Sequence, residues 1–234
     1  MGKDFSLFLL TAGLHVFGGQ FLPSLYMREP AFTENGFWYL IFYTFLSSIL
    51  TGCKYMVAFQ MGILPMHAAG VTYSPDFPDQ FSGIKLVDLY VFFTSTSVPA
   101  RVNAWNTSCQ EWLRKCVYER LETSKDMARL ITFLVSAVWH GFYGGYYLTF
   151  FTFFMLAHLA TLIFKLSKYP NSPLVKLYNS SEPVSRYIVL AFLTYYFGQT
   201  GVCFLVLSLP ICFRILSAIY FVPQLILIIG IVVV

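Results

Sequence analysis

The fold of this chain is decided by Leu130–Phe164, which reads LITFLVSAVWHGFYGGYYLTFFTFFMLAHLATLIF. These 35 residues contain no Asp, Glu, Lys or Arg. One straight helix of this length would extend roughly 50 Å, whereas the hydrocarbon core of a bilayer is ~30 Å thick. Gly141, Gly144 and Gly145 lie in the middle of the segment and favour a break there. We therefore expect two membrane-embedded helices that meet near Gly144, with His140 at the end of the first.

The composition of the whole chain is also typical of a membrane protein. Of its 234 residues, 57% are hydrophobic and 11% are charged, whereas soluble domains are about 25% charged. The basic residues are scattered and the net charge is only +4, so no nucleic-acid partner is predicted. The five cysteines and four histidines show no zinc-site spacing, and we expect neither a metal nor a cofactor.

Two apolar runs precede the central segment. Phe5–Leu22 is close to the ~20 residues that a membrane span needs. Phe37–Leu64 is longer and carries Lys54 near its middle, which predicts one tilted helix or a helix that leaves the membrane there. Val71–Lys85 contains prolines and a glycine and predicts a surface loop. Leu86–Val98 is too short to span and predicts a re-entrant or buried segment.

Two further spans are expected after the central segment. They cover Tyr187–Leu209 and Ile215–Val234, with Pro210 and Arg214 between them. No repeat and no low-complexity linker divides the chain. The prediction is an all-α, polytopic transmembrane helix bundle with short amphipathic or re-entrant helices, in which residues 1–234 form a single membrane-embedded domain.

The polar centre of the sequence is Pro99–Arg129, which holds six of the 15 basic and four of the 11 acidic residues. Within it, Thr107–Glu122 has apolar residues at helical spacing on one face, which predicts an amphipathic helix. Thr107 and Gln110 form a capping-box pattern at its start. Such a helix would lie along the membrane surface or close one end of the bundle.

His140 is the first candidate functional residue, because an ionisable group in an apolar run is costly to bury. The alternative is a core histidine satisfied by one hydrogen bond. Burial disfavours the protonated ring, so a neutral His140 would be able to accept a proton from a hydroxyl. Asn106 alone is a helix cap or part of an N-glycosylation sequon. Paired with His140, it becomes a candidate for orienting a hydroxyl or stabilising an oxyanion.

Two motifs carry a family resemblance. Trp105–Leu121, WNTSCQEWLRKCVYERL, resembles the WN…WLR..VY.RL signature of the membrane-bound O-acyltransferase (MBOAT) family, and more narrowly of its lysophospholipid acyltransferase branch. Ser136–Phe150, SAVWHGFYGGYYLTF, resembles that branch's SA.WHG.YPGYYLTF motif. Gly144 stands where the family usually has proline. The chain is also much shorter than typical members, so we expect a reduced form or the C-terminal part of a longer family fold.

The resemblance implies a bundle with an internal chamber in which an acyl chain passes from acyl-CoA to the free glycerol hydroxyl of a lysophospholipid, as in phospholipid remodelling. It implies a multi-pass protein of the endoplasmic reticulum membrane, with acyl-CoA, a lysophospholipid and the lipid bilayer as its partners. His140 is implied as the catalytic base and Asn106 as the second essential polar residue. Substrate-binding candidates are Trp105, Trp139, Gly141, Arg114, Tyr146 and Tyr147.

Several alternatives remain open at this point. The acceptor could be a diacylglycerol, a sterol or a protein, although Tyr146 and Tyr147 favour the phospholipid branch. A transporter with His140 on its conduction path is a second reading, and an inactive fragment is a third. Arg114, with Lys115 or Arg120, could meet the phosphates of CoA or could simply belong to a solvated helix face.

Overall fold

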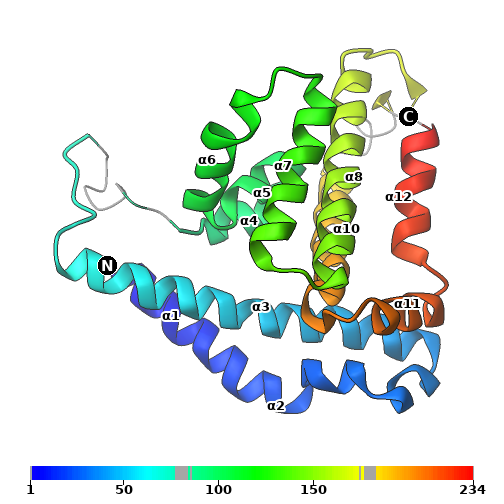
Figure 1. Ribbon diagram of the computed structural model, residues 1–234, viewed down its shortest axis with the longest axis horizontal. Helices are drawn as coiled ribbons and strands as arrows, with labels where there is room; N and C mark the ends of the chain where they lie inside the picture. The colour runs from blue at the N-terminus through cyan, green and yellow to red at the C-terminus, as the bar shows by residue number, and fades with distance from the viewer. Residues whose placement is uncertain (1, 77–83, 85, 174, 177–182, 234) are drawn as a thin grey trace.

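The computed structural model describes residues 2–76, 84, 86–173, 175–176 and 183–233. In these ranges every regular element is helical, and Figure 1 shows them assembled into a bundle. The predicted all-α architecture is therefore confirmed.

Three helices of the described ranges are long and apolar enough to cross a membrane. They are α3 (Phe37–Ala68), α8 (Gly144–Ser167) and α10 (Val184–Val206). Helices α11 (Leu209–Ala218) and α12 (Val222–Val233) would add one span if they are counted together across their 80° bend. The chain is thus a multi-pass membrane protein. Lys54 does not interrupt α3, which is one continuous helix through the whole of this run.

Helices α8 and α10 run antiparallel and in close contact, and α3 crosses them near one end (Figure 1). The contact is closest at Gly145, whose backbone N–H donates to the carbonyl oxygen of Leu207 at 2.8 Å. A Cβ atom at Gly145 would lie 2.7 Å from that same oxygen and would also collide with the carbonyl of Cys203. Only glycine permits this approach, which brings the start of α8 against the end of α10.

A buried cluster joins α3 to α10 and α11. Its members include Leu40, Ile41, Tyr43, Val202, Cys203, Val206, Cys212, Ile215 and Leu216. One polar pair lies inside this apolar packing. The side-chain N–H of Gln199 donates to the Ile41 carbonyl at 3.0 Å and to the Thr44 hydroxyl at 2.9 Å. Such interhelical bonds satisfy polar groups where lipid and core offer no water.

The first predicted span is shorter than a bilayer requires. Helix α1 (Gly2–Gly13) passes through the π-helical turn η1 (Leu14–Gly18) into α2 (Gly19–Phe21). The apolar part, Phe5–Phe21, falls in the class of shorter apolar helices and packs along α3. Two 3₁₀ turns, η2 (Ser24–Arg28) and η3 (Pro30–Glu34), then lead to α3.

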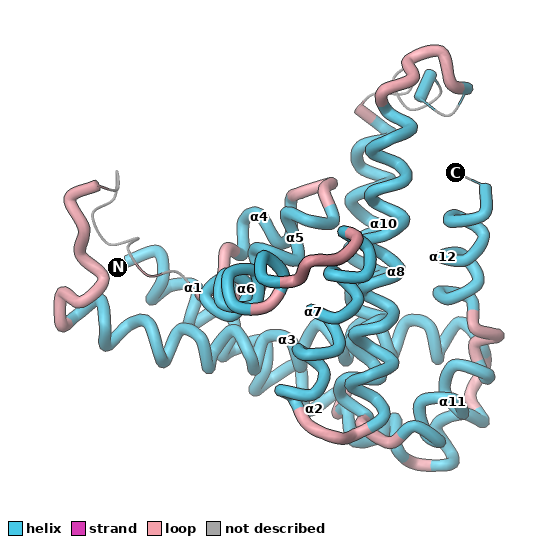
Figure 2. The backbone as a smooth tube through the Cα atoms, turned by 45° about the horizontal axis from the view of Figure 1, so that its top comes forward, coloured by secondary structure: helices cyan, strands magenta, loops and turns pink. Residues whose placement is uncertain are grey.

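Short helices follow α3; in the predicted re-entrant or buried segment, Leu86–Val98, only Val98 is buried. Of the predicted loop, residues 71–76 form turns, and the part at 77–83 and 85 lies outside the described residues. Helix α4 (Leu89–Thr94) and helix α5 (Val98–Ala104) come next. Figure 2 shows both stacked beside α6 (Thr107–Cys116).

The predicted amphipathic helix is correct in position and too long by two turns. Helix α6 ends at Cys116 and a 3₁₀ turn, η4 (Tyr118–Arg120), follows it. The N-cap position belongs to Asn106 rather than Thr107. Leu113 is buried, whereas Trp112 on the expected apolar face is 51% exposed.

The central segment folds as predicted, with α7 (Lys125–His140) followed by α8. The predicted break between the last two spans is present, but it lies at Leu207 and Ser208, just before Pro210. Pro210 lies in the first turn of α11, where its missing N–H costs nothing. Arg214 stays inside α11 and donates to the carbonyls of Arg28 and Glu29 at 2.7 and 3.1 Å. A second turn, which was not predicted, separates α11 from α12 at Tyr220 and Phe221, both with positive φ angles.

Candidate functional site

His140 is the last residue of α7, at the point where the chain reverses into α8. Gly141 follows with φ +129°, a conformation that L residues with a side chain rarely adopt. Its N–H closes the end of α7 by donating to the carbonyls of Ala137 and Val138 at 3.2 and 3.0 Å. Gly141 therefore fixes the direction in which the chain leaves His140.

Four aromatic rings surround the imidazole of His140. Centroid distances are 4.9 Å to Trp139, 5.6 Å to Tyr146, 5.2 Å to Phe150 and 5.1 Å to Phe204. The Phe150 ring is stacked on the imidazole at 27°, and the Phe204 ring meets it edge-on at 79°. No described residue forms a hydrogen bond with the imidazole. His140 thus differs from the core histidine, satisfied by one hydrogen bond, that was the alternative reading.

Two cavities are lined in part by aromatic residues whose rings contact His140. The first, of about 430 Å³, lies between α5, α6, α7 and α8, and Ser136 and Phe150 form part of its wall. We call it the α6–α7 cavity. The second, of about 410 Å³, lies between the N-terminal helices and α3, and Tyr146 and Phe204 form part of its wall. We call it the α2–α3 cavity. His140 itself lines neither cavity, but Phe150 in the first wall and Tyr146 and Phe204 in the second contact its ring, so each cavity is one side chain away from the imidazole.

Asn106 occupies a strained backbone position at the start of α6. Its φ and ψ are +49° and +56°, the left-handed region that asparagine tolerates better than most residues. Its carbonyl accepts the first bond of the helix from Gln110 N–H at 3.0 Å, yet its side chain does not cap the helix. The following N–H, of Thr107, donates to the Leu86 carbonyl at 2.8 Å. Strain of this kind, held in place by its surroundings, is typical of functional sites.

The two sequence motifs converge on one stretch of α3. Trp105 packs on Phe59 of α3 at 5.5 Å. One helical turn earlier on α3, Tyr55 packs on Phe204 at 6.0 Å, and Phe204 contacts His140. Trp105 thus contacts α3 directly, and His140 is linked to the neighbouring turn of α3 through Phe204. Asn106 lies next to Trp105 in the chain, and no hydrogen bond joins it to His140 within the described residues.

The remaining predicted site residues divide into two groups. Trp139 touches His140 but leaves 62% of its side chain exposed, and Tyr146 lines the α2–α3 cavity. Tyr147 is half-buried and makes no ring contact with His140 among the described aromatic pairs. Arg114 lines the other cavity and is already paired with Glu119 at 2.6 Å.

The neighbouring charges on α6 are also paired. Lys115 lies 2.6 Å from Glu111, and its hydrogen bond and positive charge lower the pKa of that carboxyl group. The surface helix therefore presents ion pairs rather than a row of unneutralised cations. Within the described residues, no three His, Cys, Asp or Glu side chains gather as a metal ion would require.

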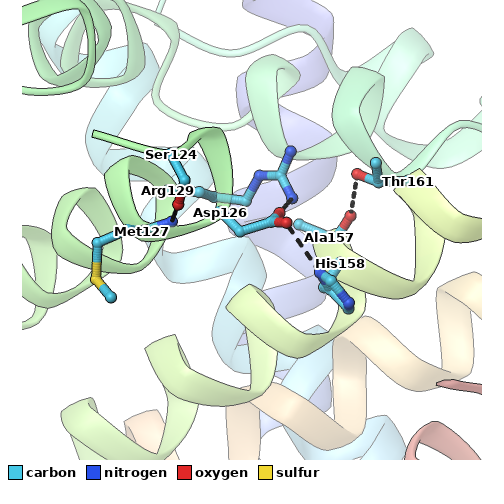
Figure 3. Close-up of polar contacts among 7 residues, drawn as sticks. All are labelled: Ser124, Asp126, Met127, Arg129, Ala157, His158 and Thr161. Carbon is cyan, nitrogen blue, oxygen red and sulfur yellow. Dashed lines mark hydrogen bonds and ion pairs between the residues drawn. The ribbon is translucent and has the colours of Figure 1, made fainter. Parts of the chain in front are cut away.

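A polar cluster at the far end of the α6–α7 cavity was not predicted from the sequence. Asp126 of α7 contacts Arg129 at 3.0 Å and the Nδ1 atom of His158 on α8 at 3.4 Å (Figure 3). Arg129 also lines this cavity, as do Ala157 and Thr161 on either side of His158. His158 appeared in the sequence only as a second intramembrane histidine, and nothing there indicated Asp126 as its partner.

Phe204 and Tyr55 were missed for a different reason. Neither belongs to a motif, and each is one aromatic residue among 25 Phe and 16 Tyr. Only the crossing of α3, α8 and α10 brings them to His140. Their sequence positions give no signal by which they could have been found.

Comparison with known proteins agrees with this arrangement. The family model described as MBOAT, membrane-bound O-acyltransferase family, matches residues 5–197. The chain is 34% identical over 130 residues to lysophospholipid acyltransferase 6 of Drosophila melanogaster, which covers 54% of this chain and 18% of that protein. It is 29% identical over 224 residues to membrane-bound glycerophospholipid O-acyltransferase 2 of Gallus gallus, which covers 91% of this chain and 41% of the relative.

A third relative, the lysophospholipid acyltransferase of Schizosaccharomyces pombe, is 28% identical over 150 residues, which is 61% of this chain and 29% of that protein. The chain thus spans less than half the length of these curated relatives. The family match itself covers most of the chain and includes both polar motifs, His140 and Asn106 among them. By its sequence and its helical architecture, this chain belongs to the membrane-bound O-acyltransferase family.

Proposed function

We propose that this protein is a lysophospholipid O-acyltransferase. The observation that carries the proposal is His140 in contact with four aromatic rings, three of which also line one of two cavities, in a chain of this family. Relatives named for lysophospholipid and glycerophospholipid acyl transfer support the acceptor class. Acyl-CoA as the donor and the endoplasmic reticulum as the location are part of the same proposal.

In the proposed reaction, His140 acts as a general base. The imidazole takes the proton of the free glycerol hydroxyl while the hydroxyl oxygen attacks the thioester carbonyl carbon. Collapse of the tetrahedral intermediate breaks the C–S bond, and the proton passes from the imidazolium to the leaving thiolate. The products are a phospholipid and CoA. The apolar rings around His140 disfavour its protonated form in the resting state, which keeps the base available.

Asn106 is proposed as the second polar group of the site. Its strained backbone and its unused capping role leave the carboxamide available for the substrate. The amide N–H would donate to the developing oxyanion or hold the attacking hydroxyl. Losing one oxyanion donor typically costs about 10²–10³ in rate, so the asparagine is expected to matter nearly as much as the histidine.

The proposal is tested by acyl transfer in membranes that contain this chain. Labelled acyl-CoA is supplied with a panel of lysophospholipids, and also with diacylglycerol and a sterol as competing acceptors. His140→Ala and Asn106→Ala are expected to abolish transfer. His158→Ala is the matched control, because it removes the other histidine of the α7–α8 helix pair, which contacts Asp126 and makes no described ring contact with His140.

Transfer to lysophospholipids that is lost in the first two variants and kept in the control supports the proposal. Transfer only to diacylglycerol or to a sterol would show that the acceptor is not a lysophospholipid. No transfer from folded, inserted protein would contradict the activity of this chain. A longer version of the chain would then show whether further segments restore it.

A further inference from the structure

An unneutralised lysine lies near the middle of a membrane-spanning helix. Lys54 belongs to α3, its exposed side chain lines the α2–α3 cavity, and no described carboxylate contacts it. A cation inside a span is costly and normally pairs with an acid or faces a functional cavity. Lys54 faces a cavity but is not paired with an acidic side chain. We therefore expect a ligand to supply the negative charge that balances it.

Two other basic side chains line the same cavity. Arg28 comes from η2 and His15 from η1, so the three bases approach from three separate elements. Arg28 uses one N–H on the carbonyl of Leu205 at 3.0 Å, and His15 is 3.2 Å from the carbonyl of Leu50. These contacts hold the two side chains at the cavity wall. None of the residues that line the cavity is Asp or Glu.

The α6–α7 cavity has a different electrostatic character. Its two arginines, Arg114 and Arg129, are each paired with a carboxylate, Glu119 and Asp126. An anion that entered there would have to displace an ion pair. The α2–α3 cavity therefore offers the more favourable of the two sites for a negatively charged group.

The position of this cavity relative to His140 narrows the choice of anion. Tyr146 and Phe204 form part of its wall and touch the imidazole at 5.6 and 5.1 Å. In a 1-acyl lysophospholipid, the phosphate ester and the free hydroxyl sit on adjacent glycerol carbons. In acyl-CoA, the whole pantetheine arm separates the thioester from the nearest phosphate. A phosphate site whose wall shares Tyr146 and Phe204 with the ring contacts of His140 therefore fits the acceptor lipid better than the donor.

We propose that the α2–α3 cavity binds the phosphate group of the lipid acceptor, with Lys54 as its principal cation and Arg28 and His15 as supporting donors. The proposal rests on the proposed acyltransferase function for the identity of the ligand. A charge-assisted hydrogen bond from lysine to phosphate would orient the glycerol, so that the neighbouring hydroxyl points toward His140.

The test is a binding measurement on the full chain in detergent, which does not depend on turnover. Three probes are compared: oleoyl lysophosphatidate, oleoylglycerol of the same chain length, and CoA. Lys54→Gln is expected to weaken lysophosphatidate binding about tenfold to a hundredfold, and to leave oleoylglycerol unchanged. Lys54→Arg is expected to restore most of the affinity. Lys165→Gln, at an exposed position in the last turn of α8, is the matched control.

The outcomes separate this inference from the proposed function. Weaker lysophosphatidate binding in Lys54→Gln supports the site even if the chain transfers no acyl group. If Lys54→Gln weakens CoA binding but not lysophosphatidate binding, the cavity binds a phosphate of the donor, and its assignment to the acceptor is wrong. Unchanged affinity for both phosphate probes overturns the inference, whether or not acyl transfer is observed.

Discussion

The rings of His140 and Phe204 meet edge to face, with 5.1 Å between their centroids and 79° between their planes. The same Phe204 ring contacts Tyr55 of α3 at 6.0 Å and Tyr146 of α8 at 4.8 Å. One side chain of α10 therefore links the candidate base to both neighbouring helices. It also forms part of the wall between the imidazole and the α2–α3 cavity.

Phe204→Leu is expected to lower acyl transfer about two- to tenfold without unfolding the protein. An edge-to-face aromatic contact is worth about 0.5–1.5 kcal/mol beyond the area it buries, and its loss would let the imidazole move. Leucine keeps most of the apolar volume. The measurement is the rate of transfer at saturating substrate, with Phe151→Leu as the control because Phe151 is 50% exposed on α8. Equal rates in the two variants would contradict a positioning role for Phe204.

Gly141→Ala is expected to reduce both stability and activity. The φ angle of +129° at this residue is available to glycine and strained for alanine, and such strain costs about 1–3 kcal/mol. Space is not the limit, since a Cβ atom would meet the nearest atom of Tyr146 only at 3.5 Å. Thermal unfolding in detergent and acyl transfer are measured together.

Gly52→Ala provides the control for this glycine. Gly52 lies inside α3, and a Cβ atom there would have no neighbour within 4 Å. Alanine in a helix interior is favoured over glycine, so Gly52→Ala is expected to leave the melting temperature unchanged or to raise it. A Gly141→Ala protein that melted and reacted like Gly52→Ala would show that the turn after His140 can relax.

The sequence predicted those parts of this fold that are determined by residues close to one another along the chain. The apolar run Leu130–Phe164 and its glycines were enough to place two helices and to put His140 at the end of the first. The break between α11 and α12 was missed, because Tyr220 and Phe221 carry no turn signal and adopt positive φ angles under tertiary constraint.

The candidate site was predictable only where it coincided with a motif. His140 and Asn106 stand out as polar residues in apolar or patterned surroundings. Phe204, Tyr55 and Lys54 reach the site through the crossing of α3 with α10, a long-range packing that no local pattern records. For Arg114 the sequence left two readings open, a contact with the phosphates of CoA or a solvated helix face, and the structure pairs it with Glu119, a neighbour beyond the end of α6.

Arg101→Met is expected to destabilise the protein strongly. Arg101 is fully buried and donates to the Ser95 carbonyl at 2.6 Å, the Thr194 hydroxyl at 3.1 Å and the Leu190 carbonyl at 3.3 Å. Methionine has no donor, so the Ser95 carbonyl loses this bond, at about 1–3 kcal/mol for a group left unsatisfied, whereas the Thr194 hydroxyl still donates to the Leu190 carbonyl at 2.8 Å. The thermal midpoint is compared with that of Arg186→Met, an exposed arginine at the start of α10. Equal midpoints would mean that α5 is held against α10 by apolar packing alone.

Asn106 offers a way to separate stability from function. Its backbone lies in the left-handed region at φ +49°, where glycine is unstrained and alanine is not. Its side chain makes no capping bond that a substitution would remove. Asn106→Gly is therefore expected to be as stable as the original protein or more stable, by up to about 1 kcal/mol. Asn106→Ala is expected to be less stable than Asn106→Gly.

Acyl transfer should not follow that order of stability. If the carboxamide of Asn106 serves the reaction, both variants lose transfer by about 10²–10³, although one of them folds as well as the original protein. A stable Asn106→Gly protein with a normal rate would show that the strained asparagine only shapes the start of α6. If Asn106→Gly is stable but inactive, the loss of activity is caused by the missing carboxamide, because the backbone at this position would still be intact.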